Sequence, residues 1–149
     1  LVLVDLSDPG NAGTLVRAAE AAGCVGVIFA GSSTDAFGPK AVRAAAGSII
    51  RLPIAESGDI TEVIAELRSS GRVLVATVVD GGAAPETIDL SGSVAILIGS
   101  EAHGLPVEVV DQCSLSVTIP MKSAVESINA AVAGAVVLFE CARQRRLSQ

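Results

Sequence analysis

The sequence predicts an α/β fold, with a mostly parallel sheet flanked by helices. Short apolar runs typical of strands alternate with stretches in which apolar residues recur every three or four positions, as on one face of a helix. Half of the 149 residues are hydrophobic but only 2% are aromatic, so Val, Ile, Leu and Ala must fill the core. Such a core is usual for a buried parallel sheet. We expect residues 1–149 to form one domain.

In the first part of the chain, strands and helices are separated by recognisable breaks. Gly23 is suited to end a helix, and Pro39 is suited to begin one. Pro and two Gly mark the loop Ser7–Gly13. We predict strands over residues 1–6, 25–30 and 48–52, and helices over residues 12–22 and 39–46.

The second part of the chain continues the alternation. Asp59 can cap a helix, with Glu62 three residues later completing a capping-box pattern. A long helix is predicted from near Val125 to Arg146, because apolar residues recur on one helical face at Val125, Ile128, Val132, Val136 and Phe139. The remaining predictions are a helix over residues 59–67, one or two helical turns over 106–111, a loop over 80–93, and strands over 73–79, 94–98 and 115–119.

Three loops that follow predicted strands carry unusual polar residues, namely 7–13, 99–104 and 119–129. In parallel sheets, ligands bind beyond the carboxyl ends of the strands. A strand that leads through a loop into a helix also presents the free backbone N–H groups of the helix N-terminus. We therefore expect these three loops to build one ligand site.

Cysteine and histidine usage argues against metal or disulfide chemistry. Cys24, Cys113 and Cys141 are odd in number and form no C-x-x-C pair, so we expect neither a disulfide framework nor a zinc site. His103 is the only histidine, and we expect no metal. No apolar run approaches the ~18 residues of a membrane span, and no stretch resembles a signal peptide. We expect a cytoplasmic protein without membrane contact.

The formal net charge is −6, which argues against a broad nucleic-acid-binding face. Lys40, Arg43 and Arg51 form a small basic group. A group of this size is more often a solvated face than an RNA contact.

Three motifs occur in order along the chain. They are Asn11-Ala-Gly-Thr-Leu-Val-Arg17-Ala-Ala, Ile98-Gly-Ser-Glu101-Ala-His-Gly104-Leu and Ile119-Pro-Met…Glu-Ser127-Ile-Asn129. Together they resemble the three motifs of the SpoU (TrmH-like) branch of the SPOUT methyltransferases, and the resemblance covers nearly the whole chain. Two positions differ from the family pattern: Ser123 stands where Gly is usual, and Ile128 where Leu is usual.

The resemblance implies an activity and a fold. Family members transfer a methyl group from S-adenosylmethionine to a ribose 2′-hydroxyl of RNA, and we expect rRNA as the substrate. The C-terminal part of the sheet is expected to form a deep trefoil knot, which general topology rules would not predict. The family also implies a homodimer with its active site near the subunit interface. Carried over to this chain, the cofactor-binding residues are Thr77, Gly99, Ile119, Met121 and Ile128.

The same motifs imply the residues that act on the RNA. Arg17 could grip an RNA phosphate bidentately; since arginine is almost never neutral in a protein, it is expected to position rather than to act as a base. Ser127 could contact the target ribose or phosphate, and Asn129 and Asn11 could orient Arg17 or the substrate. Glu101 would anchor its loop, either by accepting backbone N–H bonds or by pairing with Arg17. Simple helix capping is the alternative for Asn11, Ser127, Asn129 and Glu101.

Other functions stay open at this point. The RNA could be tRNA, because nothing in these motifs selects the substrate. The domain could bind S-adenosylmethionine or RNA without turnover. An NAD-type nucleotide-binding domain is a third alternative, although the Ser7–Gly13 loop lacks G-x-G-x-x-G. Because Leu1 lies inside a predicted strand and the chain is acidic, we expect an upstream RNA-binding domain outside this sequence.

Overall fold

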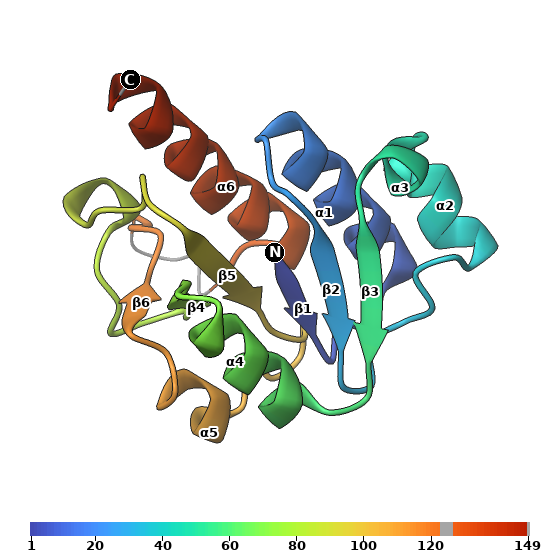
Figure 1. Ribbon diagram of the computed structural model, residues 1–149, viewed down its shortest axis with the longest axis horizontal. Helices are drawn as coiled ribbons and strands as arrows, with labels where there is room; N and C mark the ends of the chain where they lie inside the picture. Colours follow the sequence, from blue (N-terminus) through green and yellow to red (C-terminus); the bar gives the residue numbers. More distant parts are fainter. Residues whose placement is uncertain (123–126, 149) are drawn as a thin grey trace.

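The computed structural model describes residues 1–122 and 127–148, in which six parallel strands form one sheet (Figure 1). The strands are β1 (Val2–Val4), β2 (Val27–Ala30), β3 (Ile54–Ser57), β4 (Val73–Thr77), β5 (Val94–Ile98) and β6 (Leu115–Val117). Their order across the sheet is β3-β2-β1-β5-β4-β6. The predicted α/β fold with a parallel sheet is therefore confirmed. Strand order does not determine threading, so the trefoil knot stays a prediction.

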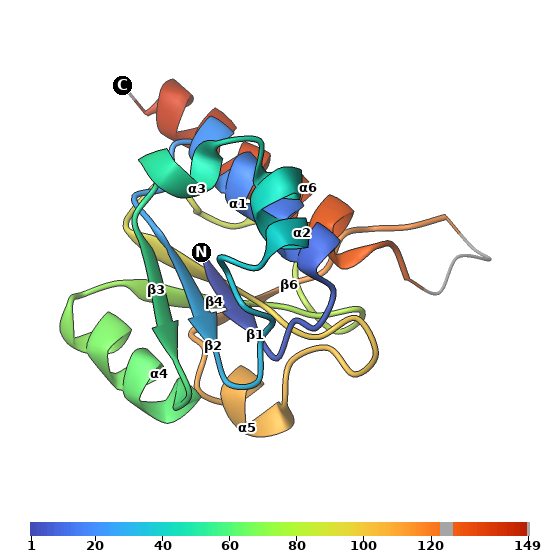
Figure 2. The same cartoon turned by 90° about the vertical axis from the view of Figure 1, so that its right-hand side faces the viewer.

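Helices cover both faces of the sheet (Figure 2). They are α1 (Pro9–Ala21), α2 (Pro39–Ala45), α3 (Ser48–Arg51), α4 (Ile60–Ser69), the 3₁₀ turn η1 (Pro85–Thr87), α5 (Val107–Val110) and α6 (Ala130–Leu147). Figure 2 shows α1, α2, α3 and α6 on one face and α4 and α5 on the other. Among these described helices, none combines the length and the apolar character needed to cross a lipid bilayer.

The core has two layers because successive side chains of a strand point to opposite faces of the sheet. On β1, Leu3 packs into the cluster that contains Leu15 of α1 and Leu138 of α6. Its neighbours Val2 and Val4 pack into the second cluster, on the side of α4. Burial on both faces explains why the strands are continuously apolar rather than alternating.

Helix α1 begins at Pro9 rather than near Ala12, because Asp8 caps it. The Asp8 carboxylate accepts a hydrogen bond from the backbone N–H of Asn11 at 2.7 Å. The alternative that Asn11 is the N-cap is therefore wrong, and its side chain is available for other contacts. Asp59 caps α4 as predicted, through the N–H groups of Thr61 and Glu62.

The prediction of a strand over residues 48–52 is wrong, because this stretch forms helix α3. Ala46 and Gly47 have φ angles of 49° and 87°, and this double left-handed turn leads directly into a helical turn. The backbone N–H of Leu52 then bonds to the Ser48 carbonyl at 2.9 Å. The sequence analysis missed β3 (Ile54–Ser57), an edge strand whose polar residues weaken its apolar signal.

Helix α6 begins at Ala130, later than predicted, and Val125 lies outside the described residues. The predicted apolar stripe is not the buried face of this helix. Val132, Val136 and Phe139 are 53%, 44% and 48% exposed, respectively. The buried face of α6 is formed by other residues, namely Ala131, Gly134, Val137, Leu138, Cys141 and Ala142. The stripe is therefore an apolar surface on the outside of the helix layer.

Candidate active site

A cavity of about 640 Å³ lies at the carboxyl ends of β4, β5 and β6, beside the start of α6. All five residues expected to bind the cofactor line it: Thr77, Gly99, Ile119, Met121 and Ile128. Three of the residues expected to act on the substrate also line it, namely Glu101, Ser127 and Asn129. The predicted convergence of the second and third loops is thus observed. The volume falls in the range of roughly 300–1,000 Å³ common for small-molecule sites.

The cavity wall contains several apolar side chains. Ile119, Met121 and Ile128 are half-buried, so each offers an apolar surface to the cavity. The Thr77 hydroxyl donates a hydrogen bond of 2.9 Å to the Leu97 carbonyl, which fixes this side chain to the neighbouring strand. Such a wall could cover a flat heterocycle while loop backbone groups bind its polar edge.

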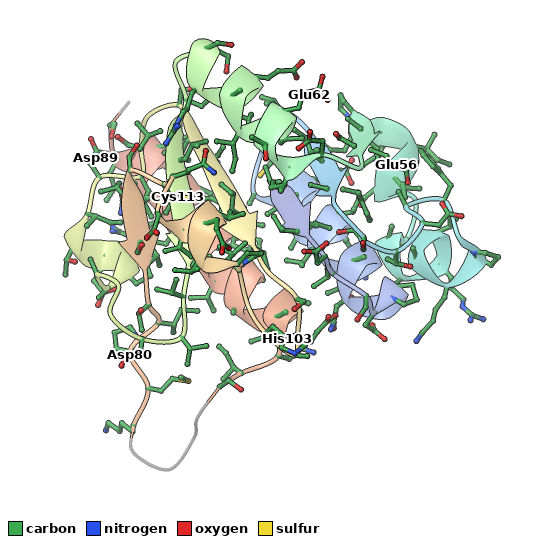
Figure 3. All side chains as sticks on the ribbon, turned by 90° about the horizontal axis from the view of Figure 1, so that it is seen from below. Glu56, Glu62, Asp80, Asp89, His103 and Cys113 are labelled. Carbon is green, nitrogen blue, oxygen red and sulfur yellow. The ribbon has the colours of Figure 1, made fainter. Side chains whose placement is uncertain are left out.

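The loop after β5 folds tightly back on itself. Ser100 and Gly104 exchange two backbone hydrogen bonds, of 3.1 and 2.9 Å. A Cβ atom on Gly99 would overlap the backbone of Gly104 and Leu105. The loop can fold back in this way only with a glycine at position 99. A side chain there would collide with the backbone of Gly104 and Leu105 rather than with a bound ligand. His103 lies in this loop and lines the cavity, a contact that the sequence analysis did not assign (Figure 3).

Glu101 joins this loop to the start of α1. Its carboxylate accepts hydrogen bonds from the Ser7 N–H at 3.3 Å, the Ser7 hydroxyl at 3.2 Å and the Asp8 N–H at 3.2 Å. Of the two contacts expected for Glu101, the structure shows the bonds to backbone N–H groups, and within the described residues it shows no ion pair with Arg17. Partial desolvation raises the pKa of Glu101, but these donors and Asn11 outweigh it and hold the pKa below its ordinary value.

Two asparagines connect the three motifs in one hydrogen-bonded chain. The Asn129 side-chain amide donates to the Asn11 side-chain oxygen at 2.9 Å. The Asn11 amide donates in turn to Glu101 at 3.0 Å. The oxygen of Asn129 caps α6 by accepting the N–H groups of Ala131 and Val132. Asn129 is therefore a helix cap as well as a wall residue of the cavity.

Arg17 is not part of the cavity wall in its own chain. It is exposed on the outward side of α1, while Leu15, Val16 and Ala19 on the inward side are buried. Helices α1 and α6 pack side by side, and the exposed apolar stripe of α6 lies on the same outward surface. The structure thus brings Asn11, Glu101 and Asn129 together but leaves Arg17 on the surface of the helix layer.

The molecule is an α/β domain with a cavity at the carboxyl edge of its parallel sheet. Residues 1–139 match the SpoU rRNA Methylase family. The chain belongs to this family, which confirms the resemblance found in the three motifs.

Relatives support the assignment along nearly the whole chain. The 23S rRNA (guanosine(2553)-2'-O)-methyltransferase RlmP of Bacillus subtilis is 32% identical over 140 residues, covering 93% of this chain and 56% of that protein. An uncharacterized tRNA/rRNA methyltransferase of Mycolicibacterium vanbaalenii is 36% identical over 146 residues, covering 98% of this chain and 46% of that protein. The chain thus spans about half the length of the curated relatives it matches.

Solved structures agree with this fold. The SpoU methyltransferase AviRb from Streptomyces viridochromogenes in complex with AdoMet superposes with a TM-score of 0.91 at 36% identity, covering 99% of this chain and 60% of that one. An AdoMet-bound rRNA methyltransferase from Sinorhizobium meliloti gives a TM-score of 0.90 at 38% identity, covering 95% and 54%.

Proposed function

We propose that this chain is the catalytic domain of an S-adenosylmethionine-dependent methyltransferase that modifies a ribose 2′-hydroxyl of rRNA in the cytoplasm. The observation that carries the proposal is the single cavity lined by both Gly99 and Asn129, at the edge of the sheet where the second and third motifs meet. The rRNA substrate is favoured over tRNA because the Bacillus subtilis relative is named for a 23S rRNA ribose. The structural neighbour from Sinorhizobium meliloti is also an rRNA enzyme.

The cavity suits S-adenosylmethionine, because its half-buried apolar residues could enclose the adenine ring. When bound, the cofactor would supply a methyl group on its positively charged sulfur. Transfer to the ribose oxygen would break that carbon–sulfur bond and release S-adenosylhomocysteine and the hydroxyl proton. Ser127 and Asn129 would then hold the ribose at the cavity mouth. The Asn11 bond to Asn129 fixes the orientation of that amide. Arg17 would grip a phosphate of the RNA.

A transfer assay tests this function directly. The full-length protein is incubated with tritium-labelled S-adenosylmethionine and with separate rRNA and tRNA fractions, and the ribose-methylated nucleotide is mapped. Label in rRNA supports the proposal, and label in tRNA alone would show that the substrate is tRNA. Cofactor binding by calorimetry without transfer to either RNA would indicate a binding domain instead. An NAD-type domain would show no response to S-adenosylmethionine.

We also infer that RNA affinity depends partly on an upstream RNA-binding domain. The net charge of −6 and the greater length of the relatives support this inference. A chain with this charge has little long-range attraction for a polyanion of its own.

A homodimer is supported by the apolar stripe on α6. Val132, Val136 and Phe139 stand at positions i, i+4 and i+7 of the helix and share one outward face. Adjoining exposed apolar side chains often mark an interface. The family resemblance implies an active site near the subunit interface, and Arg17 lies on this same outward surface. We therefore propose that a second copy of the chain packs against the apolar stripe on α6.

If the α6 stripe forms the dimer interface, a charged residue introduced into the stripe should disrupt the dimer. Val136→Glu should convert the protein from dimer to monomer in sedimentation velocity, because an unpaired carboxylate would be desolvated at the interface. The matched control is Val107→Glu, since Val107 is 63% exposed on α5, on the other face of the sheet. A Val136→Glu protein that stays dimeric would show that the interface lies elsewhere.

Replacing Asn129 should have two separable effects, one on stability and one on methyl transfer. Asn129→Ala removes the α6 cap, which costs about 1 kcal/mol of stability, and also the amide that would orient the ribose. We expect methyl transfer to fall by about 100-fold or more. Asp59→Ala is the control, because it removes the cap of α4, away from the cavity, at a similar stability cost. Wild-type turnover in Asn129→Ala, or an equal loss in Asp59→Ala, would refute a specific role.

A further inference from the structure

Phe37 is an exposed aromatic residue in a chain with very few aromatics. The protein has three Phe and no Tyr or Trp. Phe29 is buried in the core and Phe139 belongs to the stripe on α6. Phe37 is 58% exposed in the loop 31–38, which follows the carboxyl end of β2 and leads into α2. The proposed cavity lies at the same edge of the sheet.

The loop 31–38 is held in place by hydrogen bonds at Phe37 and at two residues before it. The Thr34 N–H bonds to the Leu6 carbonyl at 2.8 Å. Ala36 is fully buried, and its N–H bonds to Glu56, a residue of β3 that Figure 3 labels, at 3.1 Å. The Phe37 N–H bonds to Asp35 at 2.8 Å. The aromatic ring is thus presented from an anchored backbone, so that a ligand binding to it would pay little ordering entropy.

Contacts connect this loop region to the proposed active site. The Lys40 ammonium pairs with Asp8 at 3.2 Å, and the Asp8 N–H bonds to Glu101, which lines the cavity. Lys40 follows Phe37 by three residues, and Arg43 lies one helical turn further along α2, where it is exposed. Lys40 is therefore connected to the cavity through Asp8 and Glu101, and Phe37 and Arg43 each lie three residues from Lys40 in the sequence.

Arg51, the third cation of this region, is paired with Glu20. Arg51 makes two hydrogen bonds to Glu20, of 2.5 and 2.8 Å. This contact holds the pKa of Glu20 down to about 2 and raises the pKa of Arg51. The positive charge of Arg51 is thus offset locally. Lys40 and Arg43 are the two cations of this group nearest to Phe37 in the sequence.

We propose that Phe37 stacks on an RNA base that flanks the methylated nucleotide, while Lys40 and Arg43 contact the adjoining phosphates. The proposal rests on the proposed function, because the RNA must run from the cavity across α2. Exposed aromatic side chains beside cations are the usual platform for unpaired bases, since every base has a stacking face and every nucleotide has a phosphate. The exposed Lys40–Asp8 pair is weak enough to exchange for a phosphate.

The test compares Phe37→Ala with the full-length wild-type protein. Binding of a fluorescein-labelled single-stranded RNA is measured by anisotropy, and methyl transfer to rRNA gives KM and kcat. We expect the RNA Kd and KM to rise about tenfold, the loss expected for one stacked base. The kcat at saturating RNA and the Kd for S-adenosylmethionine should not change. Phe37→Trp should retain or tighten binding.

Two further variants make the assignment specific. Ile50→Ala is the matched control, because Ile50 is an 85% exposed apolar residue of neighbouring α3 and should leave RNA binding unchanged. Arg43→Gln should weaken RNA binding and make it less dependent on salt, as expected on loss of a phosphate contact. An equal weakening by Ile50→Ala would indicate a general surface effect and overturn the proposal.

The outcomes separate this proposal from the proposed function. If the wild-type protein methylates RNA and Phe37→Ala has unchanged Kd and KM, the stacking role is overturned and the function stands. If the wild-type protein neither binds RNA nor transfers methyl groups, the function itself fails, and the stacking role fails with it. If Phe37→Ala changes the oligomeric state in sedimentation velocity, the surface is a protein contact and the proposal is wrong.

Discussion

Replacing Gly99 with alanine should raise the Kd for S-adenosylmethionine at least about tenfold, which corresponds to about 1.4 kcal/mol. A methyl group at this position would occupy the space taken by the backbone of Gly104 and Leu105. Backbone cannot rotate aside as a side chain can, so the loop must move away from β5. The move breaks the paired hydrogen bonds between Ser100 and Gly104 and displaces Glu101 from its donors. Isothermal titration calorimetry measures the effect.

The control for this prediction is another glycine that has room. Gly92→Ala should leave cofactor binding unchanged, because no heavy atom lies within 4 Å of a Cβ placed there. Thermal unfolding of both variants shows whether the Gly99 effect is local, as expected, or a loss of the whole fold. An unchanged Kd in Gly99→Ala would mean that the loop accommodates the methyl group and that its shape does not define the site.

Much of the fold could be predicted from the pattern of apolar residues. The strands of the sheet interior are continuous apolar runs such as Val94–Ile98, because helices cover both faces. Edge strand β3 was missed because it is short and half polar. The stripe on α6 was predicted only as one apolar face of a helix, because helical periodicity shows that a face is apolar but not what that face contacts. Here the face is exposed in the single chain.

The position of the candidate site could be predicted, but its internal contacts could not. The carboxyl ends of parallel strands meet at one edge, so the polar loops at Gly99 and Ile119 had to lie close together. No local pattern indicates that Asn129 bonds to Asn11, because the two residues are far apart in sequence. The same holds for the bonds from Ser7 to Glu101, which depend on how β1 and β5 pair.

Arg17→Ala should reduce methyl transfer by at least about 100-fold while leaving fold and cofactor binding intact. A charged donor that grips the RNA beside the reacting atoms contributes on this order to transfer. The stability should change by less than about 0.5 kcal/mol, since Arg17 is exposed on a helix and alanine is a good helix former. The Kd for S-adenosylmethionine should not change, because Arg17 does not line the cavity. Transfer kinetics and calorimetry check both expectations.

Arg146→Ala is the matched control, since it removes the same charge from an exposed position in the last turn of α6. It should leave transfer near the wild-type rate. Because Arg17 lies outside the cavity of its own chain, its proposed role requires the second subunit. Mixed dimers of Arg17→Ala and Asn129→Ala subunits should therefore regain activity, as one cavity keeps an intact Asn129 and receives an intact Arg17. Mixed dimers that stay inactive would rule out action across the interface, and wild-type turnover by Arg17→Ala would refute the role itself.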